Sequence, residues 1–414
     1  MIRKTVVPGR DQAWWIALAV PATLPFSNIA TYVMGISAIG GMIIAVRNWR
    51  EILTSSATRC LFLLFLCIWL PMIIALMDAV ETAHSLKSTL TYLHFLPATL
   101  FLFWVIRDAE GSRRIQIWLT LLLALWSIDA LFQYLAGFNL LGFPHDEKRV
   151  TGVFYPSHTL GIVLAAFAPL YFATIQTSIR DYGIAWLLVP LLIAAILLAG
   201  NRSAIPMLGI ALLYAAWRLK YEVNRVSRHA LAVKILIGFI LIAAVAAGSH
   251  NHLQRFSINK FEKSMHPRVE MWRSAYEIWK DNWLNGIGVR GYRYVLPDYV
   301  SQGAGNRKIV SKKTGLGQTH PHLMLAEIGV ETGVIGITGF ILFWFVLIQY
   351  VRYLSPALLW GLMPCVVTLA VIMLPLNVHK AFYGNFYSII IWWVIAVMLA
   401  ATVPERLTNS GTSQ

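Results

Sequence analysis

The chain has 414 residues, of which 58% are hydrophobic and 13% are charged, and its formal net charge is +15. Soluble proteins carry about 25% charged residues, so this composition excludes an ordinary soluble enzyme. The apolar residues form long blocks such as 60–77 and 389–403. About 20 such residues cross the hydrocarbon core of a bilayer, so the sequence indicates a polytopic membrane protein in contact with membrane lipids.

Twelve apolar segments are predicted to span the membrane, centred near residues 19, 37, 69, 98, 126, 165, 191, 209, 241, 335, 364 and 394. We therefore expect an all-α helical bundle. Transmembrane helices 1–9 occupy residues 1–248, a large loop occupies 249–320, and transmembrane helices 10–12 with a short tail occupy 321–414. Pro21 and Pro25 interrupt the first segment, for which a cleavable signal peptide is the alternative.

The placement of Lys and Arg predicts the orientation, because basic residues concentrate in cytoplasmic loops. With the N-terminus inside, the basic runs 47–50, 112–114 and 218–228 all lie inside. The short outer loops then hold few basic residues: Lys87, Lys148, Arg149, Arg202 and Lys380. Both termini are thus expected inside and the large loop outside. Topology explains most of the positive charge, so nucleic acid is not expected as a partner, although the basic outer loop should attract anions.

The first polar residues that topology does not explain lie in 148–161, which enters the sixth span from outside. Tyr155 and His158 are candidates to line a cavity there, and a plain aromatic belt is the alternative. Arg202 follows in a short outer turn between two spans. A guanidinium held at that level suits bidentate capture of a phosphate, whereas a snorkelling interface arginine is the alternative.

Within the large loop, aromatic and apolar residues recur at helical spacing: Val269, Trp272, Tyr276, Trp279 and Trp283. This pattern predicts one face of a helix that lies along the outer interface or packs on the mouth of the bundle. Arg268 is placed in the first turn of that helix, where its charge opposes the helix dipole. An anionic ligand would compensate it, and simple solvation is the alternative.

The segment 317–336 places two histidines at the entrance of the tenth span. His320 and His322 flank a proline, and Glu327 and Glu331 follow inside the apolar run. Carboxylates at this depth should face the bundle interior with a partner. Glycines at positions 329, 333 and 336 are expected to form a smooth stripe for close helix packing.

A metal site is not expected from these residues. His320, His322 and Glu327 could be considered as ligands, but a proline separates the histidines, and a catalytic zinc needs three protein ligands. What remains is a pair of arginines and a histidine on the outer face. The arginines suit the charge of a departing diphosphate, and a neutral histidine suits proton removal from a hydroxyl group. The constellation predicts transfer from a lipid diphosphate to a hydroxyl acceptor without a metal or another cofactor.

Three segments in this order resemble the O-antigen ligase and O-antigen polymerase superfamily of bacterial envelopes. They are LAGNRSA at 198–204, HPRVEMW at 266–272 with GIGVRGY at 286–292, and THPHLMLAEIGVETGVIG at 319–336. The superfamily signature is a histidine, ten residues and Gly-x-x-Gly, which His322, Gly333 and Gly336 fit. Glu331 corresponds to its accompanying glutamate. The resemblance covers roughly residues 145–340.

The resemblance implies a GT-C class glycosyltransferase that uses a glycan linked to undecaprenyl diphosphate, with inversion and without a metal. It implies that His322 is the general base and that Arg202 and Arg268 bind the diphosphate. Arg273 or Arg290 could instead be the second arginine, and His320 is an auxiliary candidate. One departure is Leu323, because members of the superfamily usually have Asn, Ser or Gln directly after the histidine.

The acceptor remains open within this superfamily. A ligase transfers glycan to lipid A–core, a polymerase extends another lipid-linked repeat, and a protein O-oligosaccharyltransferase uses serine or threonine. The basic outer loop suits a phosphate-bearing lipid A–core, so we expect an O-antigen ligase of lipopolysaccharide biosynthesis in the bacterial inner membrane, with its site facing the periplasm. A lipid or solute transporter is the alternative class, for which Asp129 and His94 are the clearest candidate residues.

Overall fold

The computed structural model describes residues 10–145, 149–177, 183–222, 258–300, 309–311, 314–374 and 380–403, and these ranges are mostly helical. Within them there is no β-strand, and the extended pairing is limited to isolated bridges such as Phe138–Pro144. The predicted all-α class is therefore confirmed for the described part of the chain.

Six helical spans among the described residues are long and apolar enough to cross a membrane. They are α2 (Ser27–Arg47), α4 (Ser56–Ile74), α5 with α6 (Thr82–Tyr92 and Phe95–Ile106), α7 (Ala109–Ala136), α8 (Leu160–Thr177) and α15 (Met324–Arg352). Shorter apolar helices accompany them: α1 (Arg10–Ala22), α9 (Leu188–Ala199), α16 (Pro356–Ile372) and α17 (Asn385–Ala400). The chain is thus a multi-pass membrane protein.

The predicted span centres agree with the positions of the helices. Each centre lies in a helix, including residue 209 in α10 (Ala204–Glu222), except residue 241, which is outside the described residues. The number of spans and the orientation of the chain stay predictions. The remaining short helices are α3 (Trp49–Thr54), η1 (Gly152–Phe154) and η2 (Gly183–Leu187).

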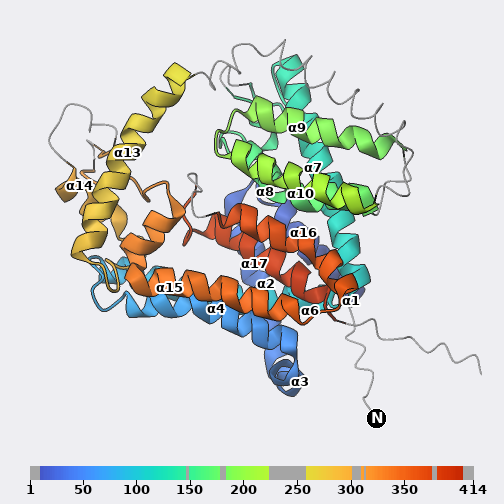
Figure 1. The fold of residues 1–414 in the computed structure, drawn as a ribbon, viewed down its shortest axis with the longest axis horizontal. Coiled ribbons are helices and arrows are strands. Elements are labelled where there is room, and N and C mark those ends of the chain that lie inside the picture. The colour runs from blue at the N-terminus through green and yellow to red at the C-terminus, as the bar shows by residue number, and fades with distance from the viewer. Residues whose placement is uncertain are drawn as a thin grey trace, which may run out of the picture.

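The centre of the bundle is α17, which is buried at every residue from Tyr387 to Ala400. Figure 1 shows α16 and α17 in the middle of the molecule, with α4 and α15 side by side along one edge and α9 and α10 towards the opposite edge. Indole N–H groups tie α17 to its neighbours. Trp392 Nε1 donates to Tyr92 Oη at 3.1 Å, and Trp393 Nε1 donates to the Ala17 carbonyl at 2.7 Å. Such bonds matter because lipid provides no hydrophobic drive for helix association.

The helix α15 is interrupted at Gly333, which has φ 62° and ψ −160°. The segment 283–288 lies along the break. The Ile287 amide donates to the Val330 carbonyl at 3.0 Å, and the Val334 amide donates to the Trp283 carbonyl at 2.8 Å. These bonds satisfy the backbone groups that a broken helix leaves open at membrane depth. The predicted smooth glycine stripe is therefore wrong at Gly333, where the glycine permits a break rather than a flat helix surface.

The large loop contributes α13 (Ile258–Asp281) and α14 (Tyr292–Tyr299). Figure 1 shows α13 and α14 at one side of the molecule, with α13 meeting the bundle near α15. They share a second apolar core with the loop after α13 and with α15: Met271, Ala275, Ile278, Ile287, Tyr292, Leu296, Ile309 and Val330.

Two expectations about α13 are wrong. Because α13 begins at Ile258, Arg268 lies well inside the helix and not in its first turn. The predicted aromatic face is also divided, since Trp272 and Trp279 are partly buried but Tyr276 is 57% exposed. Instead, the adjacent side of α13, which carries the small side chain of Ala275, packs in the second apolar core. The proline at position 267 lies inside α13 and does not mark its start.

Candidate functional site

Arg202 lies in a turn that two neighbouring residues hold in place. Gly200 ends α9 with φ 64°, a conformation that suits glycine. Asn201 is buried, and its side-chain amide donates to the His158 carbonyl at 2.8 Å. A Cβ on Gly161 would lie 2.7 Å from Asn201 Oδ1, so glycine is needed for this approach. The turn at residues 200–203 is therefore fastened to the segment that precedes α8.

Arg268 lies close enough to Arg202 for their charges to interact. The guanidinium of Arg268 is partly buried, and its pKa is lowered by that burial and by the positive charge of Arg202. Two like charges repel each other more strongly as water is removed. The fold nevertheless brings them together from the α9–α10 turn and from α13. A bound anion with at least two negative charges would offset this repulsion.

The His-Pro-His loop, residues 319–323, is fastened to the same face of α13 as Arg268. Trp272 Nε1 donates to the Pro321 carbonyl at 3.1 Å. Arg268 precedes Trp272 by one helical turn, so both side chains emerge on one side of the helix. The structure therefore places the His-Pro-His loop, through Pro321, on the side of α13 from which Arg268 emerges, near the middle of that helix.

Within this loop the two histidines lie against each other. The ring centroids of His320 and His322 are 4.2 Å apart. Thr319 Oγ1 lies 3.0 Å from His320 Nδ1. His322 has φ 54°, a left-handed conformation that is uncommon for a residue other than glycine. The histidine is thus presented on a sharply turned backbone immediately before α15.

Position 323 is the N-cap of α15, which explains the residue preference that Leu323 breaks. Its backbone is extended, with φ −150° and ψ 115°, and its side chain makes no capping hydrogen bond. Asn and Ser are among the best N-cap residues because their side-chain oxygens accept from the free amides of the first turn. Leucine leaves that turn without a side-chain cap.

The two glutamates are buried apart from Arg202, next to a different arginine. Glu327 and Glu331 are 1% and 0% exposed, as expected for carboxylates facing the interior. The Tyr383 amide donates to Glu327 Oε1 at 3.4 Å, and the positive charge of Arg290 acts on both carboxylates. Arg290 is therefore associated with the glutamates of α15.

Arg273, Tyr155 and His158 are placed less favourably for chemistry. Arg273 is exposed on α13. Tyr155 is also exposed, and its ring stacks on Phe143 with 5.3 Å between centroids. His158 remains beside the Arg202 turn through its backbone. The positive charge of Arg202 acts on Arg268.

Sequence reasoning missed Gly161 and Tyr383. Tyr383 Oη lies 2.8 Å from Thr332 Oγ1 and so joins α15 to the start of α17. Neither residue belongs to a local pattern that could have identified it, because each matters through a contact with a distant segment.

Part of the chain matches a known protein family. Residues 187–341 match a family model described as O-antigen ligase. This middle part of the chain is therefore similar to the O-antigen ligase and polymerase superfamily. The matched range contains Arg202, Arg268 and His322, as well as the break at Gly333. Members of this superfamily are glycosyltransferase-like membrane enzymes. No curated protein matches the chain.

No group of three or more His, Cys, Asp or Glu side chains is gathered for a metal ion in the part of the chain that the structure describes. His320 and His322 are adjacent, but the nearby glutamates are oriented towards Tyr383 and Arg290. The expectation of a metal-free site stays a prediction, to be tested in solution.

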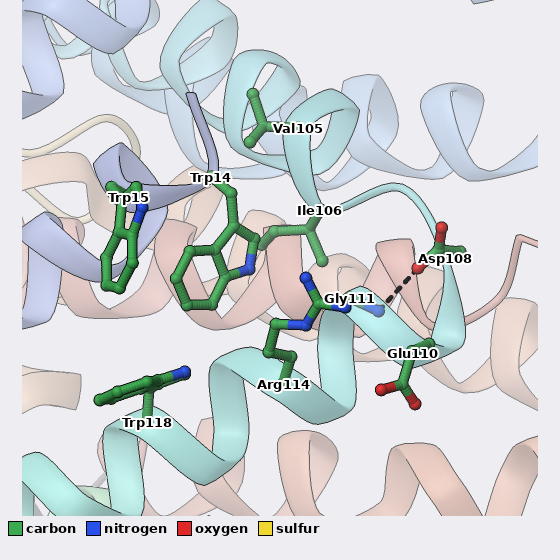
Figure 2. Close-up of a pocket in the computed structure, with 9 residues that line it drawn as sticks. All are labelled: Trp14, Trp15, Val105, Ile106, Asp108, Glu110, Gly111, Arg114 and Trp118. Atoms are coloured by element: carbon green, nitrogen blue, oxygen red, sulfur yellow. Dashed lines mark hydrogen bonds between the residues drawn. The ribbon is translucent and has the colours of Figure 1, made fainter. Parts of the chain in front are cut away.

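A separate cavity of about 410 Å³ lies where α1 begins and α6 meets α7. Figure 2 shows the indole rings of Trp14, Trp15 and Trp118 on one side, Asp108 and Glu110 on the other, and Arg114 between them. None of the candidate site residues lines this cavity. Tryptophan and arginine together are typical of a membrane–water interface, so we assign this cavity no part in the chemistry.

Proposed function

We propose that the protein is an O-antigen ligase, which transfers a glycan from undecaprenyl diphosphate to a hydroxyl group of lipid A–core at the periplasmic face of the bacterial inner membrane. The observation that carries this proposal is the approach of Arg202 to Arg268 beside the His-Pro-His loop. Paired guanidiniums next to a histidine match a diphosphate leaving group next to a hydroxyl nucleophile.

The arginine pair would bind the diphosphate and stabilise its departure. Guanidinium groups present a planar fork of N–H donors that matches phosphate oxygens. As the bond between the anomeric carbon and the diphosphate oxygen breaks, negative charge grows on that oxygen. Removing one such preorganised donor typically costs about 10²–10³ in kcat.

His322 would act as the general base. A hydroxyl oxygen of the acceptor attacks the anomeric carbon, its proton passes to the imidazole, and undecaprenyl diphosphate leaves from the opposite face. One bond forms and one breaks in a single displacement, so the configuration at the anomeric carbon inverts. A positioned base contributes about 10²–10⁴ to such a rate. The adjacent His320 ring limits the orientations open to His322.

An O-antigen polymerase or a protein O-oligosaccharyltransferase would use the same groups with another acceptor. A transporter is less favoured, because the buried carboxylate of Asp129 has a structural task. Asp129 Oδ1 accepts from the Leu140 amide at 2.8 Å, and Asp129 Oδ2 lies 3.5 Å from Asn139 Nδ2. These contacts hold the loop that follows α7.

The proposal is tested with the purified protein in nanodiscs and a labelled glycan on undecaprenyl diphosphate. Lipid A–core, a second lipid-linked repeat and a serine-containing peptide are offered separately as acceptors, with and without EDTA. We expect transfer to lipid A–core that EDTA does not reduce. Transfer to another acceptor would replace the ligase assignment, and loss of turnover in EDTA would refute the metal-free mechanism.

Variants assign the roles of the residues in the same assay. His322→Ala and Arg202→Lys should each abolish transfer while the protein still inserts and purifies normally. The lysine variant should fail because a point charge does not replace a planar fork. Arg273→Lys on the exposed side of α13 is the matched control and should retain transfer. Substantial activity in His322→Ala would remove the general-base role.

A further inference from the structure

A cavity of about 440 Å³ lies at the end of the bundle where α2 and α17 begin. Its walls come from the α1–α2 turn, from α5, from the segment after α13 and from residues 380–389. Small-molecule sites commonly measure about 300–1,000 Å³. Arg202, Arg268 and His322 do not line it, so it is separate from the arginine pair described above.

The cavity has a one-sided charge. Lys87, Arg290 and Lys380 line it together with His84, and no Asp or Glu is among its lining residues. The positive charges of Lys87 and Arg290 both act on the His84 ring. Cationic side chains from three different segments of the chain thus line the same cavity.

Three carboxylates lie near these cationic groups but do not line the cavity. Glu81 acts on His84 from α5, and Glu327 and Glu331 act on Arg290 from α15. Within the described ranges, Lys87, Arg290 and Lys380 form no ion pair with a carboxylate within 4.0 Å. The described lining of the cavity thus holds three cationic side chains and no carboxylate in direct contact with them.

The position of Arg290 is built into the fold. Its backbone has φ 66°, and the two residues before it are held by hydrogen bonds to other segments. The Gly288 amide donates to the Glu331 carbonyl at 3.1 Å, and Ser85 Oγ donates to the Val289 carbonyl at 3.0 Å. A Cβ on Gly384 would lie 3.4 Å from Arg290 Nη1, so the guanidinium lies close to the backbone at the start of α17.

Lys380 is also held in a defined place. Its ammonium lies 5.3 Å from the centroid of the Phe386 ring, and burial lowers the pKa of Lys380. Removing a lysine from water disfavours its charged form. An anion in the cavity would favour that charged form again.

We propose that this cavity is a binding site for a phosphomonoester carried by a lipid, held by Lys87, Arg290 and Lys380. A phosphomonoester carries about −1.5 to −2 charges near neutral pH and three acceptor oxygens. It therefore matches three cationic side chains better than the single charge of a phosphodiester headgroup. Its identification with the lipid acceptor rests on the proposed function, whereas the binding itself does not.

One residue of the cavity wall, Tyr383, is hydrogen-bonded to the first half of α15. Its hydroxyl group bonds to that of Thr332, and its amide donates to Glu327. Glu327 and Thr332 belong to the part of α15 that begins directly after the His-Pro-His loop. A phosphate fixed here would anchor the lipid while another part of the same molecule reaches His322.

The test measures binding and needs no turnover. Purified protein in detergent is titrated with fluorescent phosphatidic acid, a phosphomonoester lipid, and then with fluorescent phosphatidylglycerol, a phosphodiester lipid. Inorganic phosphate serves as a competitor. We expect phosphatidic acid to bind more tightly than phosphatidylglycerol and inorganic phosphate to displace it weakly. Equal affinity for both lipids, or displacement by phosphate as effective as by unlabelled phosphatidic acid, would overturn the proposal.

Variants locate the site in the same titration. Lys87→Gln and Lys380→Gln should each weaken phosphatidic acid binding about tenfold or more, because each removes a charge-assisted hydrogen bond. Lys380→Arg keeps the charge and should retain binding. Lys280→Gln on the exposed face of α13 is the matched control. Unchanged binding in the double variant Lys87→Gln, Lys380→Gln, with an unchanged melting temperature, would refute the site.

The binding assay tests the cavity proposal and the transfer assay tests the proposed function, so either proposal can fail without the other. If His322→Ala abolishes transfer but phosphatidic acid binding is the same in every lysine variant, the proposed function stands and the cavity assignment falls. If binding depends on the lysines but no glycan is transferred, the cavity assignment stands and the ligase proposal falls.

Discussion

Replacing Gly333 by alanine is expected to destabilise the protein by opening the break in α15. Gly333 has φ 62° and ψ −160°, a combination open essentially only to glycine. A Cβ at this position would lie 2.2 Å from the Leu284 carbonyl oxygen and 2.5 Å from the Asn285 amide nitrogen. Both obstacles are backbone atoms, so no side-chain rotation relieves the clash.

The size of the effect follows from two contributions. Forcing alanine into this backbone conformation costs about 1–3 kcal/mol. Moving the 283–288 segment away breaks the bonds nearest to Leu284, from the Val334 amide to Trp283 and from the Ile335 amide to Leu284. Each hydrogen bond contributes about 0.5–1.5 kcal/mol net. The free energy of unfolding should therefore fall by about 2–6 kcal/mol.

The assay is thermal unfolding of the purified protein in detergent, followed by intrinsic tryptophan fluorescence. The entropy of unfolding is about 2.1 cal/mol/K per residue, so in a chain of 414 residues one kcal/mol corresponds to about 1 °C. We therefore expect the midpoint to fall by about 2–7 °C. Gly209→Ala is the matched control, since a Cβ there meets nothing within 4 Å. That variant should gain up to about 1 kcal/mol. A Gly333→Ala protein with the wild-type midpoint would refute the reasoning.

The remaining predictions concern single contacts. Leu323→Asn should supply the missing cap of α15 and raise the unfolding midpoint, by about 0.5–2 kcal/mol in stability; an unchanged midpoint would mean that water already caps this turn. Trp272→Phe removes the bond to Pro321 and should lower kcat for glycan transfer while leaving the midpoint within a few degrees; an unchanged kcat would show that α13 does not position the loop. Asp129→Asn should weaken the bond to Leu140 and lower the midpoint by about 1 kcal/mol in stability with transfer retained; lost function at an unchanged midpoint would favour a transporter.

Sequence alone predicted the features that depend on local composition. The helix positions follow from apolar blocks, because only a helix satisfies its own backbone in lipid without a partner. The turn that carries Arg202 follows from Gly200 and Asn201 between two such blocks. The burial of Glu327 and Glu331 follows from their place inside a span, where a carboxylate facing lipid is too unfavourable.

The errors arose where a distant segment determines the local conformation. Gly333 was interpreted as part of a packing stripe, because a glycine at helical spacing has the same pattern whether the helix continues or breaks. Only the partner segment 283–288 shows that it breaks. The start of α13 was placed near Pro267 for a similar reason, since proline is more common at the beginning of a helix than inside one.

The sequence by itself determined that this chain is a multi-pass membrane protein that resembles the O-antigen ligase superfamily, and it predicted His322, Arg202 and Arg268 as candidate residues. Hydropathy and motif spacing carry that information because both are properties of neighbouring residues. Only the tertiary structure showed that the charge of Arg202 acts on Arg268 and that the charge of Arg290 acts on the α15 glutamates. Those pairings depend on the path of the chain after α13, where glycine backbones and hydrogen bonds to α15, rather than side-chain periodicity, determine the fold.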